Sequence, residues 1–414
     1  MVASMGSMGS WACAAFADGA FHGAGGRGDT SSPPIEVLTA PDASPTFGVA
    51  VAAAGSWIAV GDDRTLEGVV EAGRVHLFQR DDRGARRSDT ISGRDGRAFD
   101  RFGAAVALDE DRLLVGAPGP DGVGGGFAEV FRCEDGRWIA EATLEDEGVG
   151  PLDRFGASVA ISGGLAVVAA PRRDVAGVDA GGVAIFSWNG SAWGEAVWLT
   201  APDAAAGDRF GSSVATDGVR VVVGVVGDDD LGEKSGAAWV FRRAEKEWRA
   251  EAKLLPLHGA AREWFGHAVA IEGDHALVGA PRADSQGTTS GTVWSFRRDG
   301  GDWSAVSEVP ARDGRPGDWF GFDLAVDGDV AIAGAPGREV AIEGLDRADL
   351  GDAVRLLRRG RRWWSTDRLG GGGDATVGLR GSAVAISDAA LVLGHRPVED
   401  GPMAPGEVWV VPRR

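Results

Sequence analysis

The side chains best suited to bind a cation are concentrated in the segment Asp228-Asp229-Asp230-Leu231-Gly232-Glu233. Carboxylate oxygens are the ligands that hard cations prefer, and calcium takes six to eight of them. The segment could therefore hold a cation weakly. Charge runs on protein surfaces are usually solvated, and a solvated run is the interpretation that we favour here.

Motifs typical of enzymes are missing or misplaced. The sequence contains no Gly-x-Ser-x-Gly, and its six histidines show no metal-ligand spacing. The segment 23–28 matches a dinucleotide fingerprint, but it follows no expected strand and runs into two prolines, so it cannot open a helix. Carboxylates are too numerous to single out a catalytic pair. We therefore predict no catalytic residue, no cofactor and no metal ligand.

Composition narrows the classes of partner. The chain has 414 residues with 42 Lys plus Arg against 61 Asp plus Glu, a net charge of −19. Nucleic-acid binding and binding to an anionic membrane are disfavoured because both need a basic face. No apolar run is long enough for a transmembrane segment. Cys13 and Cys133 are the only cysteines, and we expect no disulfide because the first lies in an irregular tail.

An internal repeat defines the architecture. A Phe-Gly pair recurs every 53 to 55 residues, and a seventh unit begins at Arg380-Gly381, where Arg replaces Phe. Fourteen residues after each pair stands a glycine, or an alanine in one unit, and further glycine, apolar and tryptophan positions keep the same register. Such a period indicates stacked copies of one structural unit. The pairs start at Phe47, Phe102, Phe155, Phe210, Phe265 and Phe320.

Each unit reads as four short strands separated by glycine-rich turns. In the fourth unit we expect strands over 212–216, 220–223, 237–241 and 248–254. One such sheet cannot bury both of its apolar faces alone, so we predict an all-β, seven-bladed β-propeller of four-stranded blades. The chain ends after the third strand of unit seven, and residues 35–42 match an outer strand. The N-terminal strand should therefore complete blade seven and close the ring.

These repeats resemble the FG-GAP repeat family, whose members include the propeller of integrin α chains. The nearer resemblance is to bacterial proteins made only of such repeats, with segments like that at 208–215. It covers residues 35–414 and implies an exported or cell-surface protein that takes part in protein binding and cell adhesion. Family propellers bind calcium in long acidic hairpins between strands one and two. The corresponding hairpins here, such as Asp217-Gly218, are too short to enclose an ion, so we expect no calcium cage.

The recurring Phe, Gly and Trp positions are expected to be structural, with the aromatic side chains filling the wedges between blades. Asp100, Asp153, Asp208 and Asp318 stand two residues before a Phe, where a carboxylate can accept backbone N–H groups of the turn. The sequon at Asn189 is interpreted as a turn. Residues 1–34 are interpreted as a disordered segment, with a truncated or remnant export signal as the alternative.

The leading functional hypothesis is a noncatalytic recognition scaffold, monomeric and either secreted or surface-associated, that binds a protein or glycan. The alternative is a propeller hydrolase or lyase with its site in the central pocket, where carboxylates would converge with a His or Arg. For the recognition hypothesis, the loops between strands two and three supply a candidate ligand face. That face would carry Asp62, Asp63, Arg64, Arg172, Arg173, Asp174, Asp228, Asp229, Asp230, Arg282, Asp284, Arg338, Glu339 and Arg396.

Overall fold

The structure is a computed structural model that divides into two units, residues 1–33 and 34–414. It describes residues 35–64, 72–94, 99–119, 125–245, 247–337, 351–369, 379–396 and 405–413, with only the backbone of 379, 380, 395 and 396. The expected disordered segment 1–34 lies outside these ranges. All described elements are strands, and no described helix could cross a membrane.

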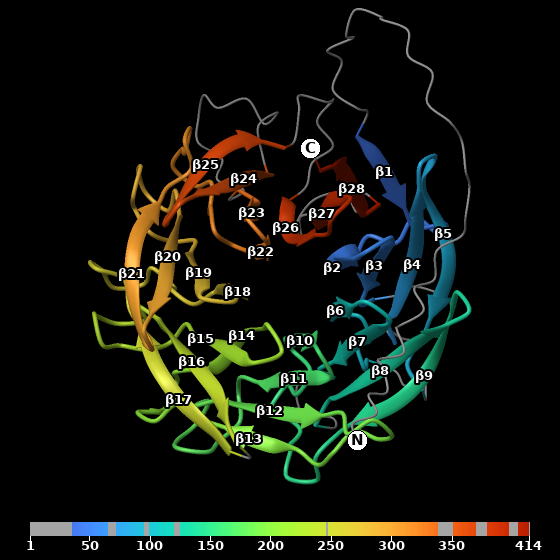
Figure 1. The fold of residues 1–414 in the computed structure, drawn as a ribbon, viewed down its shortest axis with the longest axis horizontal. Coiled ribbons are helices and arrows are strands. Elements are labelled where there is room, and N and C mark those ends of the chain that lie inside the picture. Colours follow the sequence, from blue (N-terminus) through green and yellow to red (C-terminus); the bar gives the residue numbers. More distant parts are fainter. Residues whose placement is uncertain are drawn as a thin grey trace, which may run out of the picture. The chain divides into compact units, whose positions relative to one another are not determined.

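The second unit consists of seven four-stranded antiparallel sheets arranged around a central axis (Figure 1). This confirms the predicted seven-bladed β-propeller. Blade 1 contains β2 (Phe47–Ala54), β3 (Trp57–Asp62), β4 (Arg74–Asp81) and β5 (Gly84–Ile91). Blade 2 contains β6 (Ala105–Asp109), β7 (Arg112–Ala117), β8 (Phe127–Glu134) and β9 (Arg137–Leu144). Blade 3 contains β10 (Val159–Ser162), β11 (Leu165–Ala170), β12 (Gly182–Ser187) and β13 (Val197–Leu199).

The remaining blades repeat the same order from the axis outward. Blade 4 contains β14 (Phe210–Thr216), β15 (Arg220–Val225), β16 (Ala237–Ala244) and β17 (Glu247–Leu254). Blade 5 contains β18 (Ala268–Glu272), β19 (His275–Ala280), β20 (Thr292–Asp299) and β21 (Asp302–Val309). Blade 6 contains β22 (Leu324–Asp327), β23 (Val330–Ala335), β24 (Asp352–Arg359) and β25 (Arg362–Arg368). Blade 7 contains β26 (Leu379–Ile386), β27 (Ala390–Arg396) and β28 (Glu407–Pro412), and its outer strand is β1 (Glu36–Thr39).

The ring closes as the repeat register predicts. Strand β1 pairs antiparallel with β28 from Glu36↔Val410 to Thr39↔Glu407, so the first and last described strands lie side by side in one sheet. The first and last blades also dock directly, because a Cβ on Gly394 would lie only 2.3 Å from the carbonyl oxygen of Gly48. In Figure 1 the blue β1 accordingly lies beside the red β28.

The position fourteen residues after the start of the Phe-Gly pair, a glycine in six of the seven units, is a docking point between blades. A Cβ on Gly61 would lie 2.1 Å from the carbonyl oxygen of Gly103, and one on Gly279 would lie 2.0 Å from that of Gly321. No side chain fits at such a distance, since the inner strand of the next blade passes over the glycine. The repeated glycines therefore set the spacing of the blades around the axis.

The hydrophobic core is divided into clusters, each shared by two adjacent blades. The Phe of each Phe-Gly pair is fully or almost fully buried and in five blades meets a second Phe edge to face, as Phe210 meets Phe241 with ring centroids 5.8 Å apart. Trp138 and Trp363 are buried in these clusters. The expectation that Phe and Trp fill the wedges is confirmed.

The aspartate before the Phe has the predicted turn role in three blades. The Oδ2 atoms of Asp153, Asp208 and Asp318 each accept the backbone N–H three residues earlier, at 2.8, 2.7 and 3.0 Å. These bonds fix the loop that carries the chain from an outer strand to the next inner strand. They explain why the residue type recurs without a ligand.

Candidate functional site

The structure places the described members of the predicted ligand face in the loops that follow the second strands of their blades, except Asp62, which is the last residue of β3. Arg338 and Glu339 lie outside the described residues, as does the side chain of Arg396, which ends β27. Three of the described aspartates have one structural role. The Oδ1 atoms of Asp174, Asp229 and Asp284 accept the backbone N–H five residues later, at 2.8, 2.6 and 2.7 Å. These carboxylates hold the shape of their loops.

Asp228 and Asp230 belong to a compact charge cluster around a lysine. The ammonium of Lys253 on β17 lies 2.7 Å from Asp203, 2.6 Å from Asp228 and 2.6 Å from Asp230. Burial by itself would lower the pKa of Lys253, but the hydrogen bonds to the three carboxylates outweigh it and raise the pKa above its usual value. Asp228 is only 5 % exposed. The interpretation of the run as a solvated one is therefore wrong for Asp228.

The lysine occupies the position that a cation would need. Carboxylate oxygens of Asp203, Asp228 and Asp230 all lie within 4.8 Å of one another, which is the geometry of a metal-ligand set. A covalently attached ammonium supplies one positive charge between them, where an external ion would otherwise sit. Sequence reasoning missed Lys253 because it lies on an outer strand, 23 residues after Asp230.

Two further members of the predicted face are held by partners inside the ring. Asp62 is completely buried and accepts the hydroxyls of Ser44 and Thr46 at 2.6 and 2.7 Å. Burial raises the pKa of Asp62, but the adjacent His76 side chain, the hydroxyls of Ser44 and Thr46 and the charge of Arg74 lower it further than burial raises it. Asp63, which is 2 % exposed, forms an ion pair with Arg101 from the next blade, with 2.5 Å between Oδ2 of Asp63 and Nη2 of Arg101.

Two arginines of the face lie over tryptophan rings. The guanidinium carbon of Arg173 lies 3.6 Å from the ring centroid of Trp198, and that of Arg282 lies 4.4 Å from the ring centroid of Trp264. Such cation–π contacts orient the arginine side chains along the protein surface. Ligand binding by the predicted face stays a prediction, and most of its described charges have structural partners.

The central pocket was the expected location of an enzyme site. The axial cavity has a volume of about 320 Å³, and its lining residues include Arg101 and Arg154 but no carboxylate. A carboxylate that does lie on an innermost segment, Asp323, braces two blades. Its Oδ1 accepts the N–H of Leu324 at 2.9 Å, and its Oδ2 accepts the N–H of Val384 from blade 7 at 2.7 Å. The convergence of carboxylates that would favour a hydrolase is not found among the cavity's lining residues.

Asp323 should make folding stability depend on pH. Burial raises its pKa from 3.8 to about 6, although two backbone N–H groups oppose the shift. Protonated Asp323 is therefore favoured by folding, so its stabilising contribution is complete below pH 3.8 and is lost as the pH rises through 6. A shift of this size corresponds to about 3 kcal/mol.

The test replaces Asp323 with the residue found at the same position in blades 3 and 4, where Ser158 and Ser213 stand. Urea unfolding of the parent and of Asp323→Ser should be compared at several pH values between 4 and 7.5. The stability of the parent relative to the variant should fall as the pH rises. A constant difference across this range would show that the carboxyl titrates normally.

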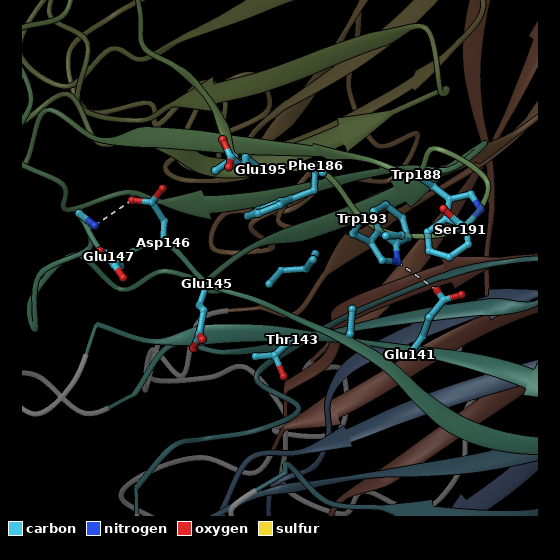
Figure 2. A pocket seen from close by; sticks show the side chains of 16 residues that line it. Glu141, Thr143, Glu145, Asp146, Glu147, Phe186, Trp188, Ser191, Trp193 and Glu195 are labelled. Carbon is cyan, nitrogen blue, oxygen red and sulfur yellow. Dashed lines mark hydrogen bonds between the residues drawn. The ribbon is translucent and has the colours of Figure 1, made fainter.

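A groove with a volume of about 740 Å³ lies on the outer side of the ring between blades 2 and 3 (Figure 2). One wall is the end of β9 with the loop that follows, and it carries Glu141, Glu145 and Glu147. The other wall is the hairpin before β13. It carries Trp188 and Trp193. None of these residues belongs to the predicted ligand face.

The groove exists because the outer strand of blade 3 is short. Strand β13 has three residues, whereas the outer strands of blades 2 and 4 have eight. The hairpin ahead of it is shaped by Asn189, whose Oδ1 accepts the N–H groups of Ser191 and Ala192 at 2.9 and 3.0 Å. This confirms the interpretation of the sequon as a turn. Gly194 stands where the aligned segment of blade 2 has Ile139, and this interruption was the available signal in the sequence.

The carboxylates of the groove fall into two kinds. Glu141 accepts a hydrogen bond from Nε of Arg112 at 2.9 Å and another from the indole N–H of Trp193 at 3.0 Å. It therefore links blades 2 and 3. Burial raises its pKa, and the hydrogen bonds from Arg112 and Trp193 lower it below the usual value. Glu145, Glu147 and Glu195 are exposed and have no ion-pair or side-chain hydrogen-bond partner among the described residues. The groove therefore carries uncompensated negative charge.

The tryptophans of the groove already contact a cation. The guanidinium carbon of Arg112 lies 4.8 Å from the ring centroid of Trp188 and 5.9 Å from that of Trp193. The two rings are 5.6 Å apart and inclined by 53°. Aromatic rings flanked by carboxylates form a surface suited to positively charged side chains.

Comparison with known proteins agrees with this architecture. The family model of the FG-GAP repeat matches residues 87–131, 138–186, 193–241, 248–296 and 303–346, more than half of the chain. The first four matches each run from the outer strand of one blade to the third strand of the next, which is the same offset that leaves β1 to complete blade 7. No curated protein matches the chain significantly. With five matched repeats set on the blades of one propeller, the chain belongs to the FG-GAP repeat family.

Proposed function

We propose that this FG-GAP propeller is a noncatalytic recognition module, exported or surface-associated, that binds a basic segment of a partner protein in the groove between blades 2 and 3. The observation that carries the proposal is that one groove holds the unpaired carboxylates Glu145, Glu147 and Glu195 toward one end and the rings of Trp188 and Trp193 toward the other. Carboxylates attract lysine and arginine side chains, and the aromatic rings give them a contact surface.

The size and openness of the groove favour an extended peptide. A volume of about 740 Å³ accommodates several side chains, and the walls follow the strand direction on the outer side of the ring. The alternative, a hydrolase or lyase in the central pocket, is less supported because the lining of the axial cavity contains no carboxylate. Hydrolysis of a substrate by a variant whose groove no longer binds peptide would favour that alternative.

The groove should bind an arginine-rich probe peptide with strong salt dependence. We expect the triple variant Glu145→Gln, Glu147→Gln, Glu195→Gln to bind about tenfold more weakly at low salt, since each exposed charge pair contributes about 0.5 kcal/mol. The difference should shrink at high ionic strength because exposed charges are screened. Fluorescence anisotropy of a labelled nonamer of arginine measures both effects.

The matched control removes the same number of charges at exposed hairpins elsewhere. Asp82→Asn, Asp135→Asn and Asp302→Asn together change the net charge equally and leave the groove intact. This control should bind the peptide almost as well as the parent. Equal weakening by the two triple variants would mean that the acidic chain attracts the peptide without a specific site.

A further inference from the structure

A second groove, with a volume of about 740 Å³, lies between blades 5 and 6 and shares no residue with the groove between blades 2 and 3. One wall is the end of β21 and the loop that follows, from Ser307 to Arg312. The other wall is the hairpin of β24 and β25. The hairpin contributes Leu357, Arg359 and the five consecutive residues from Arg362 to Thr366.

The groove runs along the outer edge of β25. Successive side chains of a strand point to opposite faces of its sheet, so five consecutive residues line one cavity where the cavity follows the edge of the strand. Trp363 and Trp364 represent the two faces, since the first is 3 % exposed and lies in the core, whereas the second is 54 % exposed. No described strand pairs with this edge, because β25 is the last strand in the order of blade 6. Its outward backbone groups can therefore pair with a further strand.

The edge lacks the charges with which proteins usually protect exposed strands. Residues 363–366 are Trp-Trp-Ser-Thr and carry no charge, whereas the corresponding positions of blade 4 include Arg249 and Glu251. Tryptophan and threonine also favour extended structure. Trp364 is the only exposed tryptophan among the described residues. An uncharged edge with an exposed aromatic ring is a suitable template for strand addition.

Unpaired arginines give the groove a local positive charge. Arg312, Arg359 and Arg362 are exposed, and none of the three has an ion pair or a side-chain hydrogen bond within the described part of the chain. Arg359 and Arg362 are cross-strand partners, and like charges in this arrangement are destabilising. The carboxylate of the lining, Glu308, already accepts the hydroxyl of Ser285. In a chain with a net charge of −19, these arginines favour an acidic ligand.

A second copy of the chain fits this edge poorly. Pairing of β25 with β25 of another copy would place four uncompensated arginines in one sheet, Arg359 and Arg362 from each chain. Like charges brought together across an interface oppose association. An acidic strand from a different protein would instead compensate the charge of the groove.

The two faces of the hairpin differ in chemistry. The partners Leu357↔Trp364 and Arg359↔Arg362 alternate along the hairpin, so the two arginines lie on the same face as Trp364. The opposite face packs on blade 5, where Trp363 shares a core cluster with blade 5 residues. A strand that alternates acidic and apolar residues would match this difference, with its carboxylates on the arginine face and its apolar side chains toward blade 5.

We propose that the outer edge of β25 binds an acidic, extended segment of a partner protein, which adds to blade 6 as a fifth strand. Backbone hydrogen bonds to β25 hold the segment, and Arg312, Arg359 and Arg362 select its charge. The site is independent of the groove between blades 2 and 3, which takes a segment of opposite charge.

A labelled nonapeptide of alternating Glu and Val tests this proposal by fluorescence anisotropy. It should bind at least about tenfold more tightly than a peptide that contains the same five Glu and four Val in two blocks, because only the alternating order places all carboxylates on one face. N-methylation of two adjacent central residues keeps the side chains and removes one N–H from each edge of the peptide. This change should also weaken binding about tenfold or more. Equal binding by either control peptide would overturn strand addition.

Variants of the hairpin test the role of the arginines. Arg359→Gln combined with Arg362→Gln should weaken binding of the alternating peptide about fivefold at low salt and less at high salt. The matched control combines Arg83→Gln with Arg137→Gln, which changes two exposed arginines of the blade 1 and blade 2 hairpins. This control should bind the peptide almost as well as the parent. Equal weakening by the two double variants would overturn the selection of charge by this groove.

Trp364→Ser tests the position of the peptide without a change of charge. Blade 5 has Ser304 at the same position, and Trp364 is exposed, so the melting temperature should change little. Peptide binding should weaken several-fold, because aromatic residues strengthen cross-strand pairing. Unchanged peptide binding would place the peptide elsewhere and overturn the proposal.

Two further measurements on the same variant separate the remaining explanations. The nonamer of arginine should bind Trp364→Ser as it binds the parent, so the proposals for the two grooves can fail separately. Sedimentation velocity should show a monomeric parent. A parent that dimerises, and that becomes monomeric in Trp364→Ser, would assign the edge to a second copy and overturn the proposal of an acidic partner.

Discussion

A chain lacking residues 1–42 is expected to melt far below the parent and to self-associate. The deletion removes β1, the outer strand of blade 7, together with the buried side chains of Leu38 and Ala40. It leaves the backbone groups of β28 exposed as an edge, and uncovered edges pair with other chains. Because each blade packs on two neighbours, the loss at blade 7 should lower the stability of the whole ring.

A pair of single substitutions isolates the contribution of β1 itself. Leu38 is 6 % exposed and packs in the core between blades 7 and 1, whereas Val37 is 47 % exposed on the other face of the same strand. Leu38→Ala should cost about 2–4 kcal/mol. Val37→Ala should stay within about 0.5 kcal/mol of the parent. Denaturant unfolding measures both, and size-exclusion chromatography follows association of the truncated chain.

If the truncated chain melted like the parent and remained monomeric, the pairing of β1 with β28 would not contribute to stability. Equal effects of the Leu38 and Val37 changes would likewise contradict closure by a strand with one buried face. Either result would leave the docking of Gly394 on Gly48 as the contact that closes the ring.

Replacement of Lys253 by alanine is expected to destabilise the protein by about 2–4 kcal/mol. The substitution leaves Asp228 buried beside Asp203 and Asp230 without a counter-charge. Removal of one partner from a buried charge pair leaves the other desolvated and uncompensated, which is the costly part of the change. Lys234→Ala is the matched control, because Lys234 is exposed and its side chain has no ion pair among the described residues.

Calcium should affect the melting temperatures of the parent and of the Lys253→Ala variant differently. Millimolar calcium is expected to leave the melting temperature of the parent almost unchanged, because the ammonium of Lys253 occupies the position between the carboxylates. In Lys253→Ala the same three carboxylates could hold the ion. Calcium at 100 times its dissociation constant would return about 2.7 kcal/mol.

Chelator-reversible stabilisation of the parent by calcium would contradict the view that Lys253 replaces a cation. A Lys253→Ala variant as stable as the parent would show that the carboxylates are solvated after all. The calcium experiment is carried out on the parent and the stability comparison on Lys253→Ala, so each outcome can be interpreted without the other. Substitution of Asp228 by serine should also be destabilising, since it removes the buried partner of Lys253.

The candidate sites could be predicted only in part. The loops that follow the second strands were located from the repeat, yet Asp174, Asp229 and Asp284 turn their carboxylates to backbone N–H groups within the same loop. The groove between blades 2 and 3 was not predicted, because it arises from the shortening of β13 and from the hairpin at Asn189. Sequence periodicity describes what the blades share, whereas this groove depends on how one blade departs from the others.

The sequence by itself determined the number of blades, their strand order and the closure of the ring. These features follow from the fixed spacing of positions that meet between blades, such as Gly61 with Gly103, where only a glycine fits. The contact recurs with a glycine in six of the seven units and with Ala169 in the third, so one sequence is sufficient to infer the geometry of the ring. The family resemblance rests on the same positions and therefore identified the fold without identifying a ligand.

Only the tertiary structure decided which charges are paired and where cavities lie. Lys253 forms an ion pair with Asp203 from the loop between blades 3 and 4, and Asp63 forms one with Arg101 from the next blade. The partners of each pair are dozens of residues apart in the sequence, and no repeated spacing links them. Ion pairs form between atoms a few ångströms apart, and side chains from different blades reach that distance only after the ring has closed. The axial cavity likewise exists only where residues from five blades converge.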